Sequence, residues 1–180
     1  FSADHENGGI SIYWEYENLE DLSHHSLNSL YSDDINTLDT FIVTSLNVGH
    51  EEYRVFSEDY NGNSSDYSES AFALNLHAGA NLISFNVLPD DNSITNVMAS
   101  IEGVATGVIG EGVAANYMEG VGWMGSLSAI DPNSGYWIMV SEDDVLLLMG
   151  EPTPRDIEYN LGAGANLISY PYRYPTPIED

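Results

Sequence analysis

Residues 74–85 read LNLHAGANLISF, and residues 159–170 read YNLGAGANLISY. Nine of these twelve aligned positions are identical at an offset of 85 residues. Self-similarity at a fixed offset indicates a repeated structural unit. The sequence therefore predicts one module over residues 74–158. A second copy begins over residues 159–180, and we expect this segment to be a linker or a strand between subunits.

In each copy a glycine precedes an Asn-Leu-Ile segment. Gly79 and Gly164 can adopt the positive φ of a tight turn. Asn81 and Asn166 are expected to hydrogen-bond the turn backbone rather than a ligand. The Leu-Ile pairs that follow favour a buried strand.

The rest of the module alternates short strand signals with turns. One helix of about three turns is predicted from apolar residues at helical spacing, namely Ile94, Val97, Met98 and Ile101. Residues 104–118 indicate strands, residues 123–130 a short helical turn, and residues 136–150 a hairpin over Ser141–Asp144. We expect a β-rich α+β module.

Residues 1–73 contain short alternating apolar segments separated by turn signals, including Asn61-Gly62. This spacing is typical of a β-sandwich. The fold class expected for the whole chain is mainly β: a sandwich over residues 1–73, followed by the β-rich module with one short helix.

Two family resemblances support this division. The stretch EEYRVFSEDYNGNSSDYSES (51–70), together with Trp14 and HSLNSLYSDD (25–34), resembles the strands and core tryptophan of a fibronectin type III domain. The succession GANLISF, VIGEGVAA, WMGSL and SGYWIMV resembles a tandem repeat of large secreted surface proteins of marine bacteria. The second resemblance implies an extracellular or cell-surface location and an accessory role, with no catalytic residues to carry over.

The charge of the chain is strongly one-sided. Twenty-nine acidic residues stand against three arginines and no lysine, which gives a net charge of −26. Such a surface repels nucleic acid, so a nucleic-acid partner is not expected. Adaptation to saline surroundings and binding of divalent cations both remain open. The sequence has no cysteine and no apolar run that suggests membrane insertion. Its start has no signal-peptide features, so we expect a mature fragment.

Motifs with restrictive catalytic spacing are missing from the sequence. The glycines from Gly103 to Gly112 lack the lysine of a phosphate-binding loop. His24 and His25 would point to opposite faces of a strand, and Ser126 lacks the glycine elbow of a nucleophile. Acidic residues are so frequent that no carboxylate pair stands out. We expect a protein that is not an enzyme and that needs no cofactor, with Ca²⁺ as the one exception left open.

A calcium site is the metal site that the sequence favours. Asp59, Asn61 and Asn63 place oxygen ligands at alternating positions, as calcium-binding loops do. The glycine and glutamate that complete an EF-hand loop are missing, and Asn61-Gly62 is also explained as a simple turn.

Aromatic residues suggest a contact surface near the C-terminal end of the sequence. Tyr170, Tyr172 and Tyr174 alternate, so they would lie on one face of a strand. Together with Leu167 and Ile168 they form a predicted interface, with a sugar-stacking platform as the alternative.

These features favour a structural or adhesive extracellular protein. It would associate with itself or with neighbouring repeats, in one version as a filament subunit joined head to tail through residues 159–180. A carbohydrate- or calcium-binding accessory module of a secreted enzyme, and a virion fibre component, are the alternatives.

Overall fold

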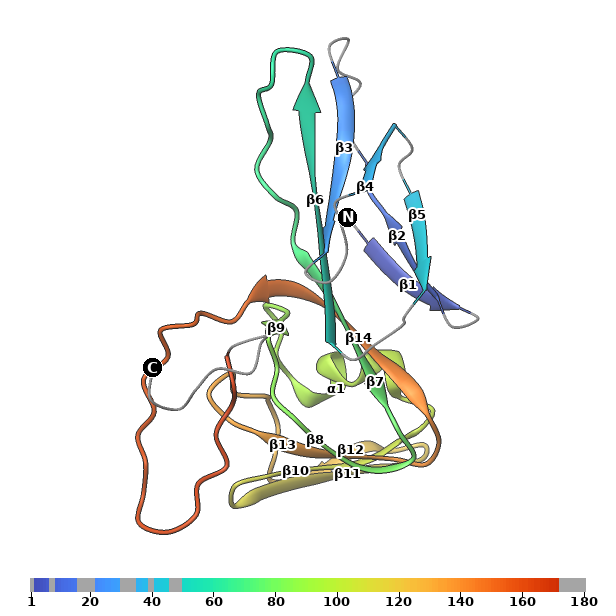
Figure 1. Cartoon of the computed structure of the whole chain (residues 1–180). Helices are drawn as coiled ribbons and strands as arrows, with labels where there is room; N and C mark the ends of the chain where they lie inside the picture. The colour runs from blue at the N-terminus through green and yellow to red at the C-terminus, as the bar shows by residue number, and fades with distance from the viewer. Residues whose placement is uncertain are drawn as a thin grey trace.

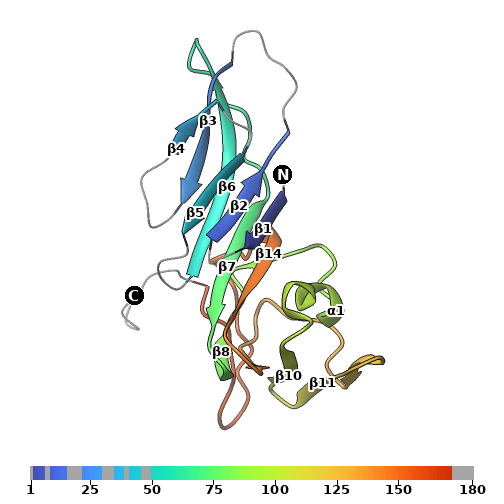
Figure 2. The same cartoon turned by 90° about the vertical axis from the view of Figure 1, so that its right-hand side faces the viewer.

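The protein is mainly β, with one short helix, as the sequence predicts. The structure, a computed structural model, describes residues 2–6, 9–15, 22–29, 35–38, 41–45 and 50–171. The described strands form three antiparallel sheets, arranged along an elongated molecule (Figures 1 and 2). No helix among the described residues is long and apolar enough to cross a membrane.

A three-stranded sheet and a six-stranded sheet enclose the first core. The three-stranded sheet has the order β1-β2-β5, with β1 at Ser2–Glu6, β2 at Gly9–Tyr13 and β5 at Phe41–Ser45. The six-stranded sheet has the order β4-β3-β6-β7-β14-β9. Its strands are β3 (Leu22–Ser29), β4 (Ile35–Thr37), β6 (His50–Asp59), β7 (Ser70–Leu76), β9 (Val87–Leu88) and β14 (Asp144–Pro152).

A five-stranded sheet packs against the other end of the six-stranded sheet and encloses the second core. Its order is β12-β11-β10-β13-β8. The strands are β8 (Gly79–Ile83), β10 (Ala105–Gly110), β11 (Val113–Met118), β12 (Gly122–Gly125) and β13 (Tyr136–Val140).

Strands β7 and β14 belong to both cores. Because side chains alternate across a strand, Ala71 and Ala73 of β7 face the first core, whereas Phe72 and Leu74 face the second. This double burial explains why β7 and β14 are almost continuously apolar. The predicted division between residues 73 and 74 lies inside β7.

The predicted helix is present but shorter and split. Helix α1 covers Ile94–Val97, and a 3₁₀ turn, η1, follows at Ala99–Ile101. The Ser93 side chain caps α1 by accepting a hydrogen bond from the Asn96 N–H. The whole predicted apolar stripe is buried in the second core.

The hairpin predicted over residues 136–150 is wrong. Strand β13 lies in the five-stranded sheet and β14 in the six-stranded sheet. The chain therefore crosses between layers at Ser141–Asp143, just as it crosses between β7 and β8. The two crossings lie side by side, because β7 pairs with β14 and β8 pairs with β13.

The helical turn predicted from Trp123 is also wrong, because residues 122–125 form β12. Trp123 lies opposite Tyr117 of β11, and their rings make an edge-to-face contact with centroids 5.5 Å apart. Gly122 and Gly125 have positive φ, which a helix does not accommodate. Cross-strand aromatic pairing therefore prevails over helix formation here.

Candidate functional site

The first copy of the repeat makes the turn that leads from β7 into β8. Gly79 has φ +103°. The His77 N–H donates to Asn81 Oδ1 at 3.0 Å, and Asn81 Nδ2 donates to the His77 carbonyl at 2.8 Å. The sequence prediction for this turn, a left-handed glycine and a structural asparagine, is confirmed.

The second copy makes the same turn 85 residues later. Gly164 has φ +106°. The Gly162 N–H donates to Asn166 Oδ1 at 2.8 Å, and Asn166 Nδ2 donates to the Gly162 carbonyl at 3.1 Å. The repeated sequence thus specifies the same glycine–asparagine turn in both copies, although the residues that pack around the two turns differ.

The two copies differ in how their apolar side chains are covered. Leu76 is 3% exposed and its counterpart Leu161 is 64% exposed. For Ile83 and Ile168 the values are 7% and 45%, and for Phe85 and Tyr170 they are 1% and 44%. In the described part of the chain, the second copy therefore carries core-type side chains that are much more exposed than their counterparts in the first copy.

The end of the second copy lies against the five-stranded sheet. Gly135 N–H donates to the Leu167 carbonyl at 3.0 Å, and Ser169 N–H donates to the Asn133 carbonyl at 2.9 Å. These bonds form a short antiparallel bridge that extends β13 towards its N-terminal side. The Tyr170 N–H donates to Ser84 Oγ at 3.1 Å, so the segment lies near the end of β8.

Of the predicted interface residues, the structure brings Leu167, Ile168 and Tyr170 together on this segment. Tyr172 and Tyr174 lie outside the described residues. Sequence reasoning missed Glu111, whose Oε2 accepts the Leu167 N–H at 2.7 Å and ties the segment to the β10–β11 turn. A long-range contact of this kind leaves no local sequence signal.

The predicted calcium residues form a compact turn after β6. Asp59 Oδ1 accepts the N–H groups of Asn61 and Asn63 at 2.8 and 2.9 Å, and Asp59 Oδ2 accepts Asn63 Nδ2 at 2.7 Å. These bonds, chiefly those from Asn63, lower the pKa of Asp59. Both Asp59 carboxylate oxygens thus accept N–H hydrogen bonds within the turn. A calcium ion bound here would have to share these oxygens with the N–H donors. No group of three or more His, Asp or Glu side chains suited to a metal occurs among the described residues.

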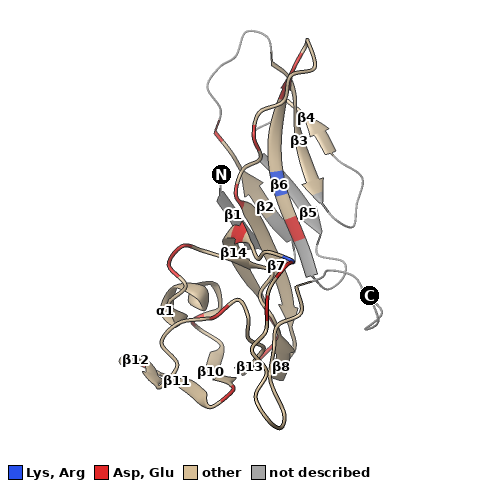
Figure 3. Cartoon of the chain, turned by 90° about the vertical axis from the view of Figure 1, so that its left-hand side faces the viewer, with Lys and Arg blue, Asp and Glu red and all other residues tan. Residues whose placement is uncertain are grey.

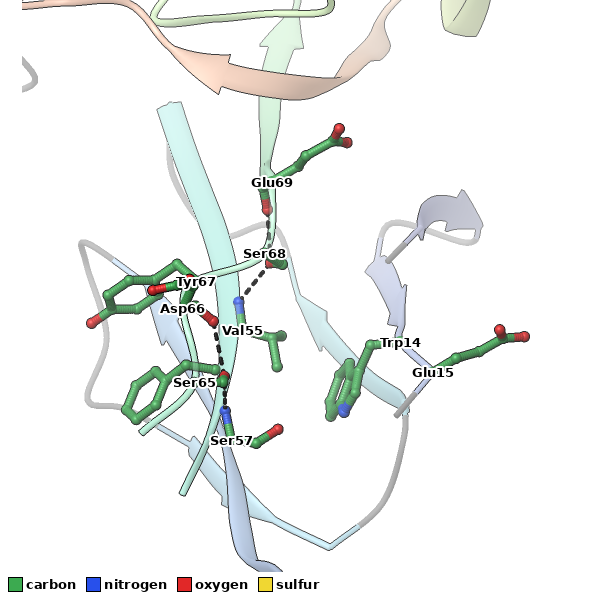
Figure 4. A pocket seen from close by; sticks show the side chains of 10 residues that line it. Trp14, Glu15, Val55, Ser57, Ser65, Asp66, Tyr67, Ser68 and Glu69 are labelled. Atoms are coloured by element: carbon green, nitrogen blue, oxygen red, sulfur yellow. Dashed lines mark hydrogen bonds between the residues drawn. The ribbon is translucent and has the colours of Figure 1, made fainter. Parts of the chain in front are cut away.

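An open cleft of about 500 Å³ lies between Trp14 and the segment that follows this turn (Figure 4). On one wall, backbone N–H groups of β6 donate to serine side chains instead of to the carbonyls of a paired strand. Ser57 N–H donates to Ser65 Oγ at 3.0 Å, and Val55 N–H donates to Ser68 Oγ at 2.9 Å. On the other wall, Trp14 is buried, and its Nε1 has no hydrogen-bond partner among the described residues.

The first core behind this cleft contains a buried histidine. His25 Nδ1 lies 2.8 Å from Ser57 Oγ, and its ring contacts the edge of Trp14. Burial, and to a lesser extent the neighbouring His24, lower the pKa of His25. His25 is therefore a neutral core residue at physiological pH.

Comparison with protein-family models, with curated proteins and with solved structures gave no match to this chain.

Proposed function

We propose that this chain is a non-catalytic, extracellular structural or adhesive protein that associates through the second copy of its repeat. The observation that carries the proposal is the contrast between the two copies. Both make the same glycine–asparagine turn, yet Leu161, Ile168 and Tyr170 are exposed where Leu76, Ile83 and Phe85 are buried. Burying such side chains contributes about 2 kcal/mol each, so the second copy has a strong tendency to acquire a covering surface.

The covering surface follows from the first copy. There, β7 pairs with β14 and β8 pairs with β13, and the side chains between them complete the second core. The second copy would recruit equivalents of β13 and β14 from a neighbouring repeat or a neighbouring chain. In a neighbouring copy of this chain β7 and β8 already occupy these places, so there the second copy would instead pair with a free sheet edge such as β12.

Strand recruitment between successive units joins them head to tail, and such contacts build fibres when the rotation between units does not close a ring. The resemblance to tandem repeats of secreted surface proteins favours the same role. The strongly acidic composition suits an exported protein in saline surroundings.

Sedimentation velocity over a concentration series tests the proposal. We expect the wild-type chain to associate, and we expect the double variant Ile168→Ser/Tyr170→Ser to associate much more weakly. Tyr60→Ser is the matched control, because Tyr60 is 75% exposed in the turn after β6, remote from the second copy. Equal association of the wild type and the double variant would refute the role of residues 159–171.

Carbohydrate binding is a second candidate function, and the Trp14 cleft is the observation that favours it. The cleft is lined by Trp14 and Tyr67, by serine side chains and by the carboxylates Glu15 and Glu69, a mixture of aromatic and polar groups suited to a polyhydroxyl ligand. Titration with oligosaccharides, followed by tryptophan fluorescence in wild type and in Ser57→Ala, tests it. An unchanged spectrum over the whole titration would reject it.

A further inference from the structure

The correspondence between the two copies extends to the strand before the turn, at the same offset of 85 residues. The residues of β7 that face the second core are Phe72, Leu74 and Leu76. The residues at their positions in the second copy are also apolar or aromatic, namely Ile157, Tyr159 and Leu161. Ile168 and Tyr170 continue this pattern at the positions of Ile83 and Phe85. The segment 155–170 thus has a side chain suited to the second core wherever the segment 70–85 places one there.

The register of β14 would accept either segment as its partner strand. At present β14 pairs with β7, and Gly150 faces Ser70. In the same register 85 residues further along, Gly150 would face Arg155, and residues 151–154 would form a loop of four residues. Loops of this length commonly connect the two strands of a hairpin. Residues 155–161 can therefore fold back onto β14 in the register that β7 now has, at the cost of the two residue pairs between β14 and β9.

The second copy already touches β13, the strand with which β8 pairs. Ile168 faces Ser134 in an antiparallel bridge, whereas its counterpart Ile83 faces Tyr136. The two facing residues are two positions apart on β13, which is about 7 Å along a strand. Because side chains alternate with a period of two, a shift by two positions keeps each side chain on its own side of the sheet. Once β8 has left, such a shift would bring Ile168 opposite Tyr136.

We propose that the two copies of the repeat exchange within one chain, so that residues 155–170 can replace residues 70–85 in the second core. In the present arrangement β7 and β8 complete that core. In the exchanged arrangement the second copy completes it, and the first copy is released. The inference goes beyond the proposed function, because it concerns a rearrangement inside a single chain. No second molecule with a charge of −26 has to approach for it to occur.

The first core determines which copy occupies the place. β7 contains no Asp, Glu, Lys or Arg (Figure 3), and its Ala71 and Ala73 are buried in the first core. The residues at their positions in the second copy are Asp156 and Glu158, both exposed at present. Exchange would place these two carboxylates against the first core, where burial of a charge without a partner is strongly unfavourable. An intact first core therefore excludes the second copy from β14, and a weakened first core favours exchange.

Pairs of introduced cysteines distinguish the two arrangements, because the chain has no cysteine of its own. Leu147 faces Ala73 at present and would face Glu158 after exchange. Directly opposite residues of antiparallel strands have Cα atoms about 4.5–5.5 Å apart, which a disulfide can bridge. Ala73→Cys/Leu147→Cys therefore reports the present arrangement, and Leu147→Cys/Glu158→Cys reports the exchanged one. Leu147→Cys/Arg155→Cys is the control for random collision, since Arg155 is exposed like Glu158 but would lie on the opposite face of the strand.

The rate of disulfide closure in a glutathione buffer gives the readout, in dilute protein, with mass spectrometry to separate bonds within a chain from bonds between chains. Ile12→Ala weakens the first core and Ile101→Ala weakens the second core, and both isoleucines are fully buried. We expect Ile12→Ala to speed closure of the Leu147→Cys/Glu158→Cys pair about tenfold. We expect Ile101→Ala to leave it unchanged, because both arrangements use the second core. In the Ile12→Ala background this pair should also close about tenfold faster than the control pair.

Two results would overturn the proposal. One is closure of the Leu147→Cys/Glu158→Cys pair no faster than that of the control pair in the Ile12→Ala background. The other is equal acceleration by Ile12→Ala and Ile101→Ala, which would mean that the disulfide reports general unfolding. Because this disulfide forms within one chain, its failure leaves association through the second copy to be decided by sedimentation velocity.

Discussion

Replacing the two equivalent asparagines by alanine should have very different costs. Asn81 and Asn166 make the same hydrogen bonds within their turns, but Asn81 is 7% exposed and lies at the layer crossing, whereas the second turn is open to solvent. The local structure is thus matched, and only the surroundings differ.

The magnitude follows from the bonds that each variant loses. Asn81→Ala removes the 3.0 and 2.8 Å bonds with the His77 backbone and leaves a gap where the buried Asn81 side chain lies. Two such bonds, with the loss of packing around the buried Asn81 side chain, amount to about 1–3 kcal/mol of unfolding free energy. In Asn166→Ala water can replace the lost bonds, so we expect a cost of about 0.5 kcal/mol or less.

Urea unfolding followed by far-ultraviolet circular dichroism measures both values through the shift in the midpoint. Asn160→Ala is the control, since this exposed residue lies in the same segment as Asn166. The measurements are made at a protein concentration where the chain is monomeric. Equal costs for Asn81→Ala and Asn166→Ala would refute the view that only the first copy has a packed environment.

Three further predictions concern the core, a close approach and the Asp59 turn. Ile83→Ala should lower the unfolding free energy by about 2–4 kcal/mol and Ile168→Ala by less than about 1 kcal/mol, because only Ile83 leaves a cavity in a core; similar losses in urea titrations would contradict this. Gly125→Ala should be strongly destabilising in thermal unfolding, since its Cβ would clash with the Ala114 carbonyl oxygen and with the Ala115 backbone. Gly120 has φ +75°, and a Cβ atom there would meet no atom within 4 Å, so Gly120→Ala should lower the unfolding free energy by only about 1 kcal/mol. Equal melting temperatures for Gly120→Ala and Gly125→Ala would count against the close backbone contact at Gly125. Asp59 has a folded pKa below its ordinary value, so its contribution to stability is present at neutral pH and is lost as pH falls through that folded pKa. Carboxyl titration by nuclear magnetic resonance should show this pKa rising in Asn63→Ala, and an unchanged pKa would mean that Asn63 is not the cause.

Local features of the fold were predictable because short-range chemistry determines them. Gly79 and Asn81 specify their turn through backbone freedom and a side chain that bonds the adjacent backbone. The spacing from Ile94 to Ile101 specifies a helical stripe, and the structure keeps it although the helix is short.

The pairing of strands across layers was not predictable in the same way. A hairpin and a crossing between two sheets share one local pattern, apolar runs around a polar turn such as Ser141–Asp143. The choice depends on β7 and β8, which lie more than fifty residues earlier in the sequence. Likewise, the apolar run of β7 does not reveal that its two faces serve different cores.

The candidate interface was predictable only in part. The sequence repeat drew attention to Leu167, Ile168 and Tyr170, because they occupy the positions of Leu82, Ile83 and Phe85 in the first copy. Sequence reasoning also missed that five strands contain no Asp, Glu, Lys or Arg in a protein of 29 acidic residues. Only the strand register shows that Leu82, Trp137 and Ile109 lie in one exposed row.

Hydrogen–deuterium exchange at several protein concentrations tests the central claim most directly, because it reports on residues 161–171 in the unmodified chain. We expect the backbone amides around Ile168 to exchange more slowly as concentration rises, while those of β8, which are already paired in the first copy, stay unchanged. Exchange at residues 161–171 that is the same at every concentration would contradict association through the second copy of the repeat.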